Sequence, residues 1–326
     1  MKRLTGTTLR IAGAMAIVVG LSGIQAKAAE CIAPADPGGG WDFTCRTVGK
    51  LLLDLDLVDA PVQVTNMPGG VGAVAYAHVI ADRADQEDLL VAASTVGVTQ
   101  IAQGKYPADT DVMRWVGMLA TDVGVIAVAK DSPIQTLDQL LAEMKENPGS
   151  IAAAGSSGVG GWDHIRLLML AREAGMDAEA QRNLRWVQFD GGGPAVTQMM
   201  GGHVGLVSTD LGEIAGFVES GDIRLLAVLS DERVPAFPDA PTAIEQGLDV
   251  TGLNWRGFYT GGDVSDEAYT GWVETMQKLY ESPEWETTAT ASGLIPVWRG
   301  GEEFEAYVTE QAEEMRAISR DIGVIQ

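Results

Sequence analysis

Histidine is scarce in this sequence, and its scarcity narrows the chemistry to be considered. Only three histidines occur in 326 residues, His78, His164 and His203, and they are widely separated. Because histidine is the most frequent general base in enzymes, an enzymatic function is disfavoured. The histidines and the two cysteines also lack the spacing of a metal-ligand set, so we expect neither a metal nor another cofactor.

Several enzyme signatures are missing as well. The chain contains no G-x-G-x-x-G, no G-x-x-x-x-G-K-[ST] and no G-x-S-x-G, which removes the usual dinucleotide, phosphate-loop and nucleophile-elbow motifs. Carboxylates are plentiful, yet no pair stands out as an acid/base couple. An enzyme acting on a carboxylic acid remains an alternative, which turnover of a ligand would reveal.

Basic residues are few. The chain has 22 lysines and arginines against 45 aspartates and glutamates. Removal of the N-terminal signal described below leaves 18 basic residues and a net charge of −27. Such a surface repels nucleic acids and anionic membranes, so neither is an expected partner. We expect a monomer whose attraction for any anionic ligand is built locally.

Long apolar runs are limited to the N-terminus. Three basic residues among the first ten precede the apolar stretch Ile11–Ile24, and Ala26-Lys27-Ala28 fits a signal-peptidase site. Residues 1–29 therefore read as a signal peptide, cleaved near residue 28 or 29, and the mature protein is expected in the periplasm. An uncleaved membrane anchor is the alternative.

Cysteine occurs only twice, as Cys31 and Cys45. In an exported protein this pair favours a disulfide over two free thiols. The bridge would close a loop of about 15 residues and contribute about 3 kcal/mol of stability. It would also hold the enclosed turn in one shape.

That enclosed turn is the most informative stretch of the chain. A short apolar strand runs into Pro37 and the consecutive glycines Gly38–Gly40, and a helix is predicted over Asp42–Asp56. Glycine lets backbone N–H groups approach a guest closely. Asp42 or Thr44 can open the helix, and a helix N-terminus attracts anions. The turn is therefore predicted to form one half of a carboxylate site.

The rest of the chain repeats the order of strand, glycine-rich turn and helix, which is typical of an α/β fold with parallel sheets. Further glycine-rich turns lie at residues 66–72, 155–161 and 190–194. Each is either a tight corner or a ligand-binding loop at a strand end. We expect residues 30–128 and 252–326 to form lobe 1 and residues 129–251 to form lobe 2. We predict two separate strands at Trp115–Leu119 and Val125–Ala129. The strands predicted to cross between the lobes are Val125–Ala129 and Leu253–Tyr259.

Individual side chains near these turns have two interpretations each. The hydroxyls of Ser94, Thr95, Ser156 and Ser157 either donate to a ligand or cap helices. Trp41, like Trp162 and Trp255, either flanks the ligand or packs in the core. Arg256 either binds a carboxylate or forms a salt bridge between domains.

Five segments resemble a known family in combination. Cys31-Ile32-Ala33-Pro34-x-x-Pro37-Gly38-Gly39-Gly40-x-Asp42-x-Thr44-Cys45 is similar to the solute receptors of tripartite tricarboxylate transporters, and to their citrate and tricarboxylate branch in particular. The other four segments are residues 67–76, 191–197, 224–228 and 256–259. The turn before His164 departs from the branch, because Trp162 and His164 stand where small and amide residues are usual.

The resemblance implies a two-lobed type II periplasmic-binding-protein fold, in which each lobe is a sheet flanked by helices and two crossing strands join the lobes. It also implies carboxylate recognition by backbone N–H groups of the first turn and of a partner turn in the other lobe. The candidate ligand-binding residues are Pro37, Gly38, Gly39, Gly40, Trp41, Asp42, Ser94, Thr95, Ser156, Ser157, Gly158, Val159, Gly160, Gly193, Asp210 and Arg256.

The expected function is that of an extracytoplasmic receptor. It would capture citrate or another tri- or dicarboxylate between its lobes and deliver it to the permease subunits of a tripartite tricarboxylate transporter. The alternatives are a sensor that presents its ligand to a signalling receptor and, less favoured, the carboxylic-acid enzyme considered above.

Overall fold

The computed structural model describes residues 28–321 and 323–325. The predicted signal peptide lies outside these residues except for its last two positions. Within the described part of the chain, no helix is both long and apolar enough to cross a membrane.

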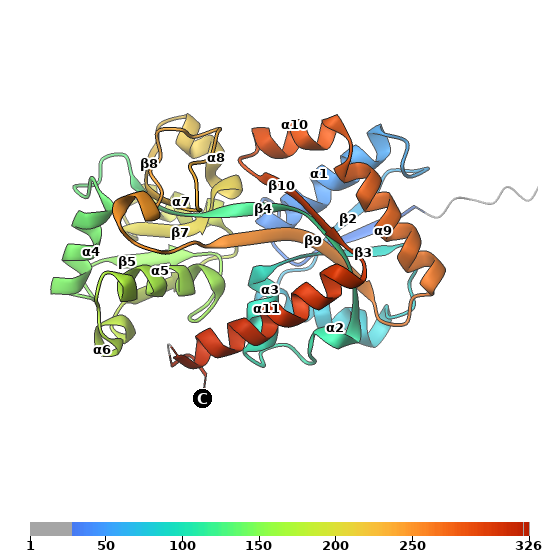
Figure 1. Ribbon diagram of the computed structural model, residues 1–326, viewed down its shortest axis with the longest axis horizontal. Helices are drawn as coiled ribbons and strands as arrows, with labels where there is room; N and C mark the ends of the chain where they lie inside the picture. Colours follow the sequence, from blue (N-terminus) through green and yellow to red (C-terminus); the bar gives the residue numbers. More distant parts are fainter. Residues whose placement is uncertain (1–27, 322, 326) are drawn as a thin grey trace, which may run out of the picture.

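The molecule has two lobes, each built on one sheet (Figure 1). The first lobe has strand order β2-β1-β3-β9-β4-β10, with β1 parallel to β2 and β3 and with β9 antiparallel to its neighbours. Its strands are β1 (Glu30–Ala33), β2 (Gln63–Asn66), β3 (Leu89–Ser94), the first part of β4 (Met113–Ala129), β9 (Leu253–Gly261) and β10 (Ile295–Gly300). Its helices are α1 (Gly40–Asp54), α2 (Ala73–Asp82), α3 (Thr95–Ala102), α9 (Asp266–Tyr280), α10 (Pro283–Ala291) and α11 (Glu302–Asp321), with short 3₁₀ turns at Gly70–Gly72 and Thr110–Val112.

The second lobe has strand order β8-β4-β7-β5-β6. Its strands are the second part of β4, β5 (Ala152–Gly155), β6 (Arg185–Gln188), β7 (Leu206–Asp210) and β8 (Ile223–Leu229). Its helices are α4 (Leu137–Glu146), α5 (Trp162–Glu173), α6 (Ala178–Arg182), α7 (Gly192–Met200) and α8 (Leu211–Glu219), with a 3₁₀ turn at Ile244–Gln246. The two-lobed α/β fold expected from the sequence is confirmed.

Strand β4 joins the lobes without a break. Val123 pairs with Leu253 in the first sheet, and the next residue, Gly124, pairs with Asp210 and Leu229 in the second. The prediction of two separate strands, Trp115–Leu119 and Val125–Ala129, was therefore wrong. The residues between them include Asp122 and Gly124, which are poor strand formers, and pairing with both sheets keeps them extended.

Other differences from prediction concern the ends of elements and the last quarter of the chain. Residues 95–102 form α3, which was not predicted. Ser94 caps this helix by accepting a hydrogen bond from the Val96 N–H. Helix α10 and strand β10 were not predicted. Strand β10 contains Pro296 and Gly300 and depends on antiparallel pairing with β4.

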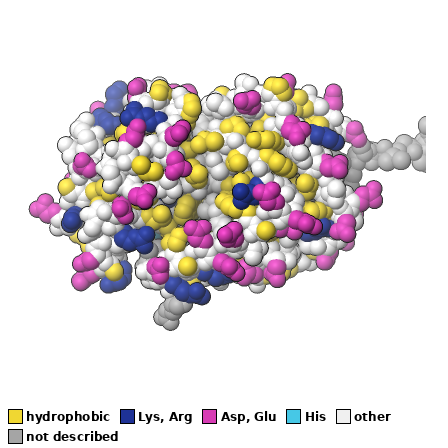
Figure 2. Space-filling view, in the orientation of Figure 1, with side chains coloured by type: hydrophobic (Ala, Val, Ile, Leu, Met, Phe, Trp, Pro, Cys, Tyr) yellow, Lys and Arg dark blue, Asp and Glu magenta, His cyan; other side chains and the backbone are white. Residues whose placement is uncertain are grey.

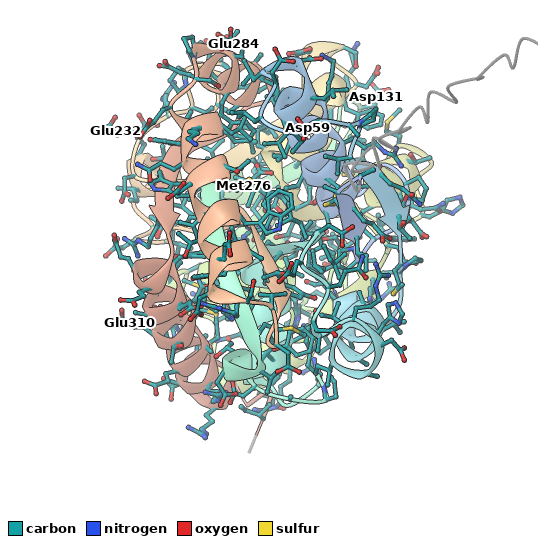
Figure 3. All side chains as sticks on the ribbon, turned by 90° about the vertical axis from the view of Figure 1, so that its right-hand side faces the viewer. Asp59, Asp131, Glu232, Met276, Glu284 and Glu310 are labelled. Carbon is teal, nitrogen blue, oxygen red and sulfur yellow. A yellow bond between two sulfur atoms is a disulfide. The ribbon has the colours of Figure 1, made fainter. Side chains whose placement is uncertain are left out.

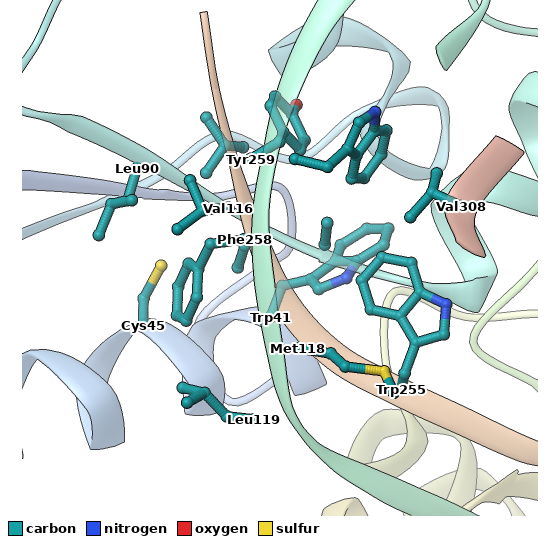
Figure 4. Close-up of a cluster of buried hydrophobic side chains, with 14 of the residues drawn as sticks. Trp41, Cys45, Leu90, Val116, Met118, Leu119, Trp255, Phe258, Tyr259 and Val308 are labelled. Carbon is teal, nitrogen blue, oxygen red and sulfur yellow. The ribbon is translucent and has the colours of Figure 1, made fainter. Parts of the chain in front are cut away.

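The core of the first lobe lies between its sheet and helices α1, α3 and α11 (Figure 4). Trp255 is fully buried, and its ring meets those of Trp115 and Phe304 edge-on at centroid distances of 6.2 and 5.1 Å. Its indole N–H donates to Gln311 Oε1 of α11 at 2.6 Å. The C-terminal helix is thus fixed to the sheet beside the junction of the lobes. Separate apolar clusters cover the two faces of the second sheet.

The disulfide predicted between Cys31 and Cys45 is present, with the two Cα atoms 5.8 Å apart. It ties β1 to α1, and Cys45 packs into the core beside Trp41 and Phe258 (Figure 4). The turn between the cysteines is therefore held from both ends.

Acidic side chains are spread over both lobes of the face in Figure 2, among fewer lysines and arginines. The acids labelled in Figure 3 all lie at the surface: Asp59, Asp131, Glu232, Glu284 and Glu310. Much of the negative charge therefore lies at the surface of both lobes.

Candidate functional site

A small cavity of about 50 Å³ lies between the lobes. It is enough for a few water molecules. Its lining comes from both lobes and consists of Pro34, Ala35, Gly39, Gly40, Trp41, Pro68, Gly69, Val71, Ser94, Val96, Ser156, Asp190, Gly191, Glu213 and Arg256.

The first glycine-rich turn is braced from behind by Asp42. One carboxylate oxygen accepts hydrogen bonds from the Gly38 N–H at 2.9 Å and from Arg46 Nε at 3.0 Å, and the other accepts from Asn66 Nδ2 at 2.8 Å. Burial raises the pKa of Asp42, but these donors outweigh it, and the pKa lies below its ordinary value. Asp42 therefore holds the turn in shape from outside the cavity lining.

Helix α1 points its N-terminus at the cavity. Its N-cap residue is Gly39, and no side chain caps it. The N–H groups of Gly40 and Trp41, in the first turn, have no acceptor within the helix. Both residues line the cavity, so the helix start offers backbone donors and positive dipole charge to an anion.

Ser94 adds a hydroxyl beside this helix start. Its Oγ accepts hydrogen bonds from Trp41 Nε1 at 3.1 Å and from the Val96 N–H at 3.3 Å. With both bonds accepted, its own O–H is left to donate into the cavity. Trp41 is 8% exposed and packs in the core of the first lobe. It also lines the cavity, so it has both of the roles considered for it.

The turn at residues 155–161 contributes only Ser156 to the cavity. The Ser156 N–H and Oγ both donate to Asp163 Oδ2, at 2.8 and 2.5 Å, and the Gly160 N–H donates to His164 Nδ1 at 2.9 Å. The N–H groups of Ser156 and Gly160 are thus already hydrogen-bonded to side chains of α5, the helix that follows the turn. Its tip, Val159, is 63% exposed.

The tip of this turn contacts the first lobe away from the cavity. The carbonyl of Gly160 accepts from Gln103, and that of Val159 accepts from Lys105 Nζ at 3.3 Å. The turn opposite the first glycine-rich turn is instead that of Asp190 and Gly191, where a Cβ placed on Gly191 would lie 3.4 Å from the Gly39 Cα.

Arg256 of β9 lines the cavity and forms salt bridges to three acids through Nη2. The distances are 2.6 Å to Asp122, 2.9 Å to Asp210 and 3.5 Å to Glu213. Because Asp210 and Glu213 belong to the second lobe, the interdomain salt bridge considered for Arg256 is present. Among the described residues, Arg256 Nε has no hydrogen-bond partner.

The network continues through Arg166, which contacts Asp163 at 3.0 Å and Asp210 at 2.6 Å. Burial raises the pKa of Asp210, but the two guanidiniums outweigh it, and the pKa falls below its ordinary value. Burial dominates at the other acids, raising the pKa of Glu213 to about 7 and that of Asp122 to about 6. Asp210 therefore forms salt bridges to both arginines. The negative charge of Glu213 is only weakly balanced by Arg256.

Glu213 was not among the predicted ligand-binding residues. It lies in the first turn of α8, three residues after the end of β7, and its Oε2 accepts a hydrogen bond from the Gly192 N–H at 2.5 Å. One feature of the sequence could have identified Glu213 as a site residue. It is an acidic residue in the first turn of a helix that directly follows a strand.

The predicted ligand residues divide into two groups. Six line the cavity: Gly39, Gly40, Trp41, Ser94, Ser156 and Arg256. The others lie outside its lining: Pro37, Gly38, Asp42, Thr95, Ser157, Gly158, Val159, Gly160, Gly193 and Asp210. Across the described residues, no cluster of three or more His, Cys, Asp or Glu side chains is arranged to hold a metal ion.

Two α/β lobes that share crossing strands and enclose a cavity at their junction define a two-lobed binding protein. The family described as "Tripartite tricarboxylate transporter family receptor" matches residues 55–324. The chain belongs to this family of solute receptors, as the resemblance of its sequence motifs implied.

Individual relatives are distant. The chain is 24% identical to Protein BugT of Bordetella pertussis over 304 residues, which cover 91% of this chain and 90% of that protein. The solved structure of the periplasmic binding protein BugD matches with a TM-score of 0.81 and 20% identity, covering 91% of this chain and 98% of that one. MatC from Rhodopseudomonas palustris with bound malate matches with a TM-score of 0.77 and 19% identity, covering 89% and 98%.

Proposed function

We propose that this receptor captures a small organic carboxylate in the cavity between its lobes and delivers it to a transporter permease. The observation that carries the proposal is the uncapped start of α1, where Gly39, Gly40 and Trp41 meet the hydroxyl of Ser94 at the cavity. Backbone N–H groups and a helix dipole are suited to an anionic group. The malate bound to MatC is consistent with this ligand class.

Ligand entry requires the lobes to separate. The cavity of about 50 Å³ offers little space for an organic acid. The lobes are joined at the Val123–Gly124 step of β4 and at the start of β9. A hinge at these strands would open the cavity and close it again around the ligand.

The finer parts of the proposal rest on the sequence resemblance. Citrate and other tri- and dicarboxylates are the first candidate ligands, and the site of action is the periplasm after removal of the signal peptide. The partner is a membrane permease of the tripartite tricarboxylate type, and the protein performs no catalysis of its own.

A thermal-shift screen of tri- and dicarboxylates, hydroxy acids, amino acids and aromatic acids tests the ligand class. A ligand at one hundred times its Kd stabilises the folded state by about 2.7 kcal/mol, which raises the melting temperature measurably. We expect at least one carboxylate to do so. Uptake of that compound by cells with and without the permease genes then tests delivery, and unchanged uptake would favour the sensor alternative.

A further inference from the structure

We propose that Glu213 determines ligand specificity by occupying a second anion position in the cavity. The receptor then prefers a ligand with one ionised carboxylate and a hydrogen-bond donor at its other end. This inference rests on the proposed function, because it concerns which carboxylates the same cavity accepts.

The surroundings of the Glu213 carboxylate are suited to an anion. Its Oε2 accepts the N–H of Gly192, the first residue of α7, and its Oε1 is 3.5 Å from Arg256 Nη2. A Cβ placed on Gly40, the first residue of α1, would be 2.5 Å from Glu213 Oε1 and 2.4 Å from Arg256 Nη1. The side chain thus sits between two helix starts and the one guanidinium that lines the cavity.

The surrounding charges leave no surplus cation for a second ligand carboxylate. Three buried acids, Asp122, Asp163 and Asp210, share two guanidiniums with Glu213, whose side chain is 6% exposed. The guanidiniums are those of Arg166 and Arg256. Arg256 is 3% exposed and already contacts three of the acids. A further ionised group beside Glu213 would be repelled at short range in a poorly solvated site.

A donor at the same place would be favoured instead. An ionised carboxylate accepts hydrogen bonds and donates none. A ligand hydroxyl, amide or ammonium directed at Glu213 would therefore gain a charge-assisted hydrogen bond. The first carboxylate of the ligand remains at the start of α1, bound by the free N–H groups there and by the Ser94 hydroxyl. The receptor thereby selects among carboxylates by the second polar group that each of them directs at Glu213.

Calorimetric titration of matched ligand pairs tests this assignment. The probes are the unbranched dicarboxylates from malonate to adipate and the half-amide of each, measured at pH 8, where Glu213 is ionised. For the best-fitting length, we expect the wild-type protein to bind the half-amide at least tenfold more tightly than the dicarboxylate. In Glu213→Gln, which keeps an oxygen to accept the Gly192 N–H, the ratio should fall at least tenfold.

Glu219→Gln is the matched control, since it removes the same charge from the exposed end of α8, and its ratio should equal that of the wild type. A wild-type protein that prefers the dicarboxylate at every length overturns the inference, whether or not the Glu213 variant folds. An unchanged ratio in a folded Glu213→Gln protein overturns it as well. Failure of every carboxylate and half-amide to bind would instead reject the proposed function, and the inference with it.

Discussion

At the scale of single residues, two acids outside the cavity lining, Asp42 and Asp163, shape the two glycine-rich turns. Asp42 binds the Gly38 N–H, and Asp163 binds the Ser156 N–H, so each reaches back from the first turn of its helix to its own glycine-rich turn. At the first turn this arrangement leaves the start of α1 free for a guest. At the second it uses up the donors of Ser156, so the two turns are not equivalent.

Gly40 tests how closely the lobes must approach. An added Cβ would clash with the charged groups of Arg256 and Glu213, so Gly40→Ala should hinder closure and weaken ligand binding at least tenfold. Gly216→Ala is the matched control, because a Cβ there meets nothing within 4 Å. Equal affinities of the two variants in titration calorimetry would show that closure does not involve this contact.

The pKa of Glu213 gives stability a pH dependence. The pKa is raised from 4.5 to about 7 in the folded state, so its contribution is fully present below about pH 4.5 and is lost as the pH rises through about 7. Glu213→Gln should therefore be the more stable protein at pH 8, by on the order of 2 kcal/mol relative to their difference at pH 5. Urea unfolding at the two pH values measures this, and parallel stability curves would be inconsistent with a buried, uncompensated Glu213.

At the scale of elements, the segment from β1 to α1 combines a rigid frame with an open helix start. The Cys31–Cys45 bridge fixes the strand to the helix, while three glycines between them keep side chains away from the backbone donors. Stability and access to the helix start are therefore provided by different residues of one short segment.

The disulfide can be removed without touching the cavity lining. Replacing both Cys31 and Cys45 by alanine should lower the free energy of unfolding by about 3 kcal/mol and weaken ligand binding, because the turn loses its fixed shape. Urea unfolding of the oxidised protein, with and without reductant, measures the first effect. The double variant, which has no bridge to reduce, is the control for the reductant, and full stability in it would contradict this role of the bridge.

Elements determined by local sequence could be predicted, and those determined by distant pairing could not. The first turn, the cysteine pair and helix α1 follow from glycine, proline and apolar spacing within a few residues. The continuity of β4 depends on both sheets, and β10 on its pairing with β4. The role of Glu213 depends on lobe contact, which brings the start of α8 against α1. No local pattern carries that information.

At the scale of the whole molecule, the proposed capture of an anion takes place against an overall charge of −23, or −27 without the predicted signal segment. Attraction within the cavity is local, whereas the repulsion acts over distance and is screened by salt, with a Debye length of about 10 Å at 0.1 M. Closing the lobes also removes the bound group from that repulsive surface.

Association kinetics should reveal this repulsion. Because salt screens the negative surface, the association rate of an anionic ligand should rise between about 0.01 and 0.3 M NaCl. Stopped-flow fluorescence, using the tryptophan of the cavity wall, Trp41, as the reporter, measures the rate. A rate that falls with salt would indicate a positively charged entry path instead.

We propose that the start of α1 binds the carboxylate, and the Gly39→Asp variant gives the sharpest test of this role. Gly39 is the N-cap of α1, where aspartate is among the favoured residues, so the fold should be kept while an internal carboxylate occupies the anion site. Gly39→Asn, which caps without charge, is the control. In calorimetric titration with the carboxylate found by screening, we predict at least a hundredfold loss of affinity for Gly39→Asp and a smaller loss for Gly39→Asn. Unchanged affinity in a folded Gly39→Asp protein would contradict the account.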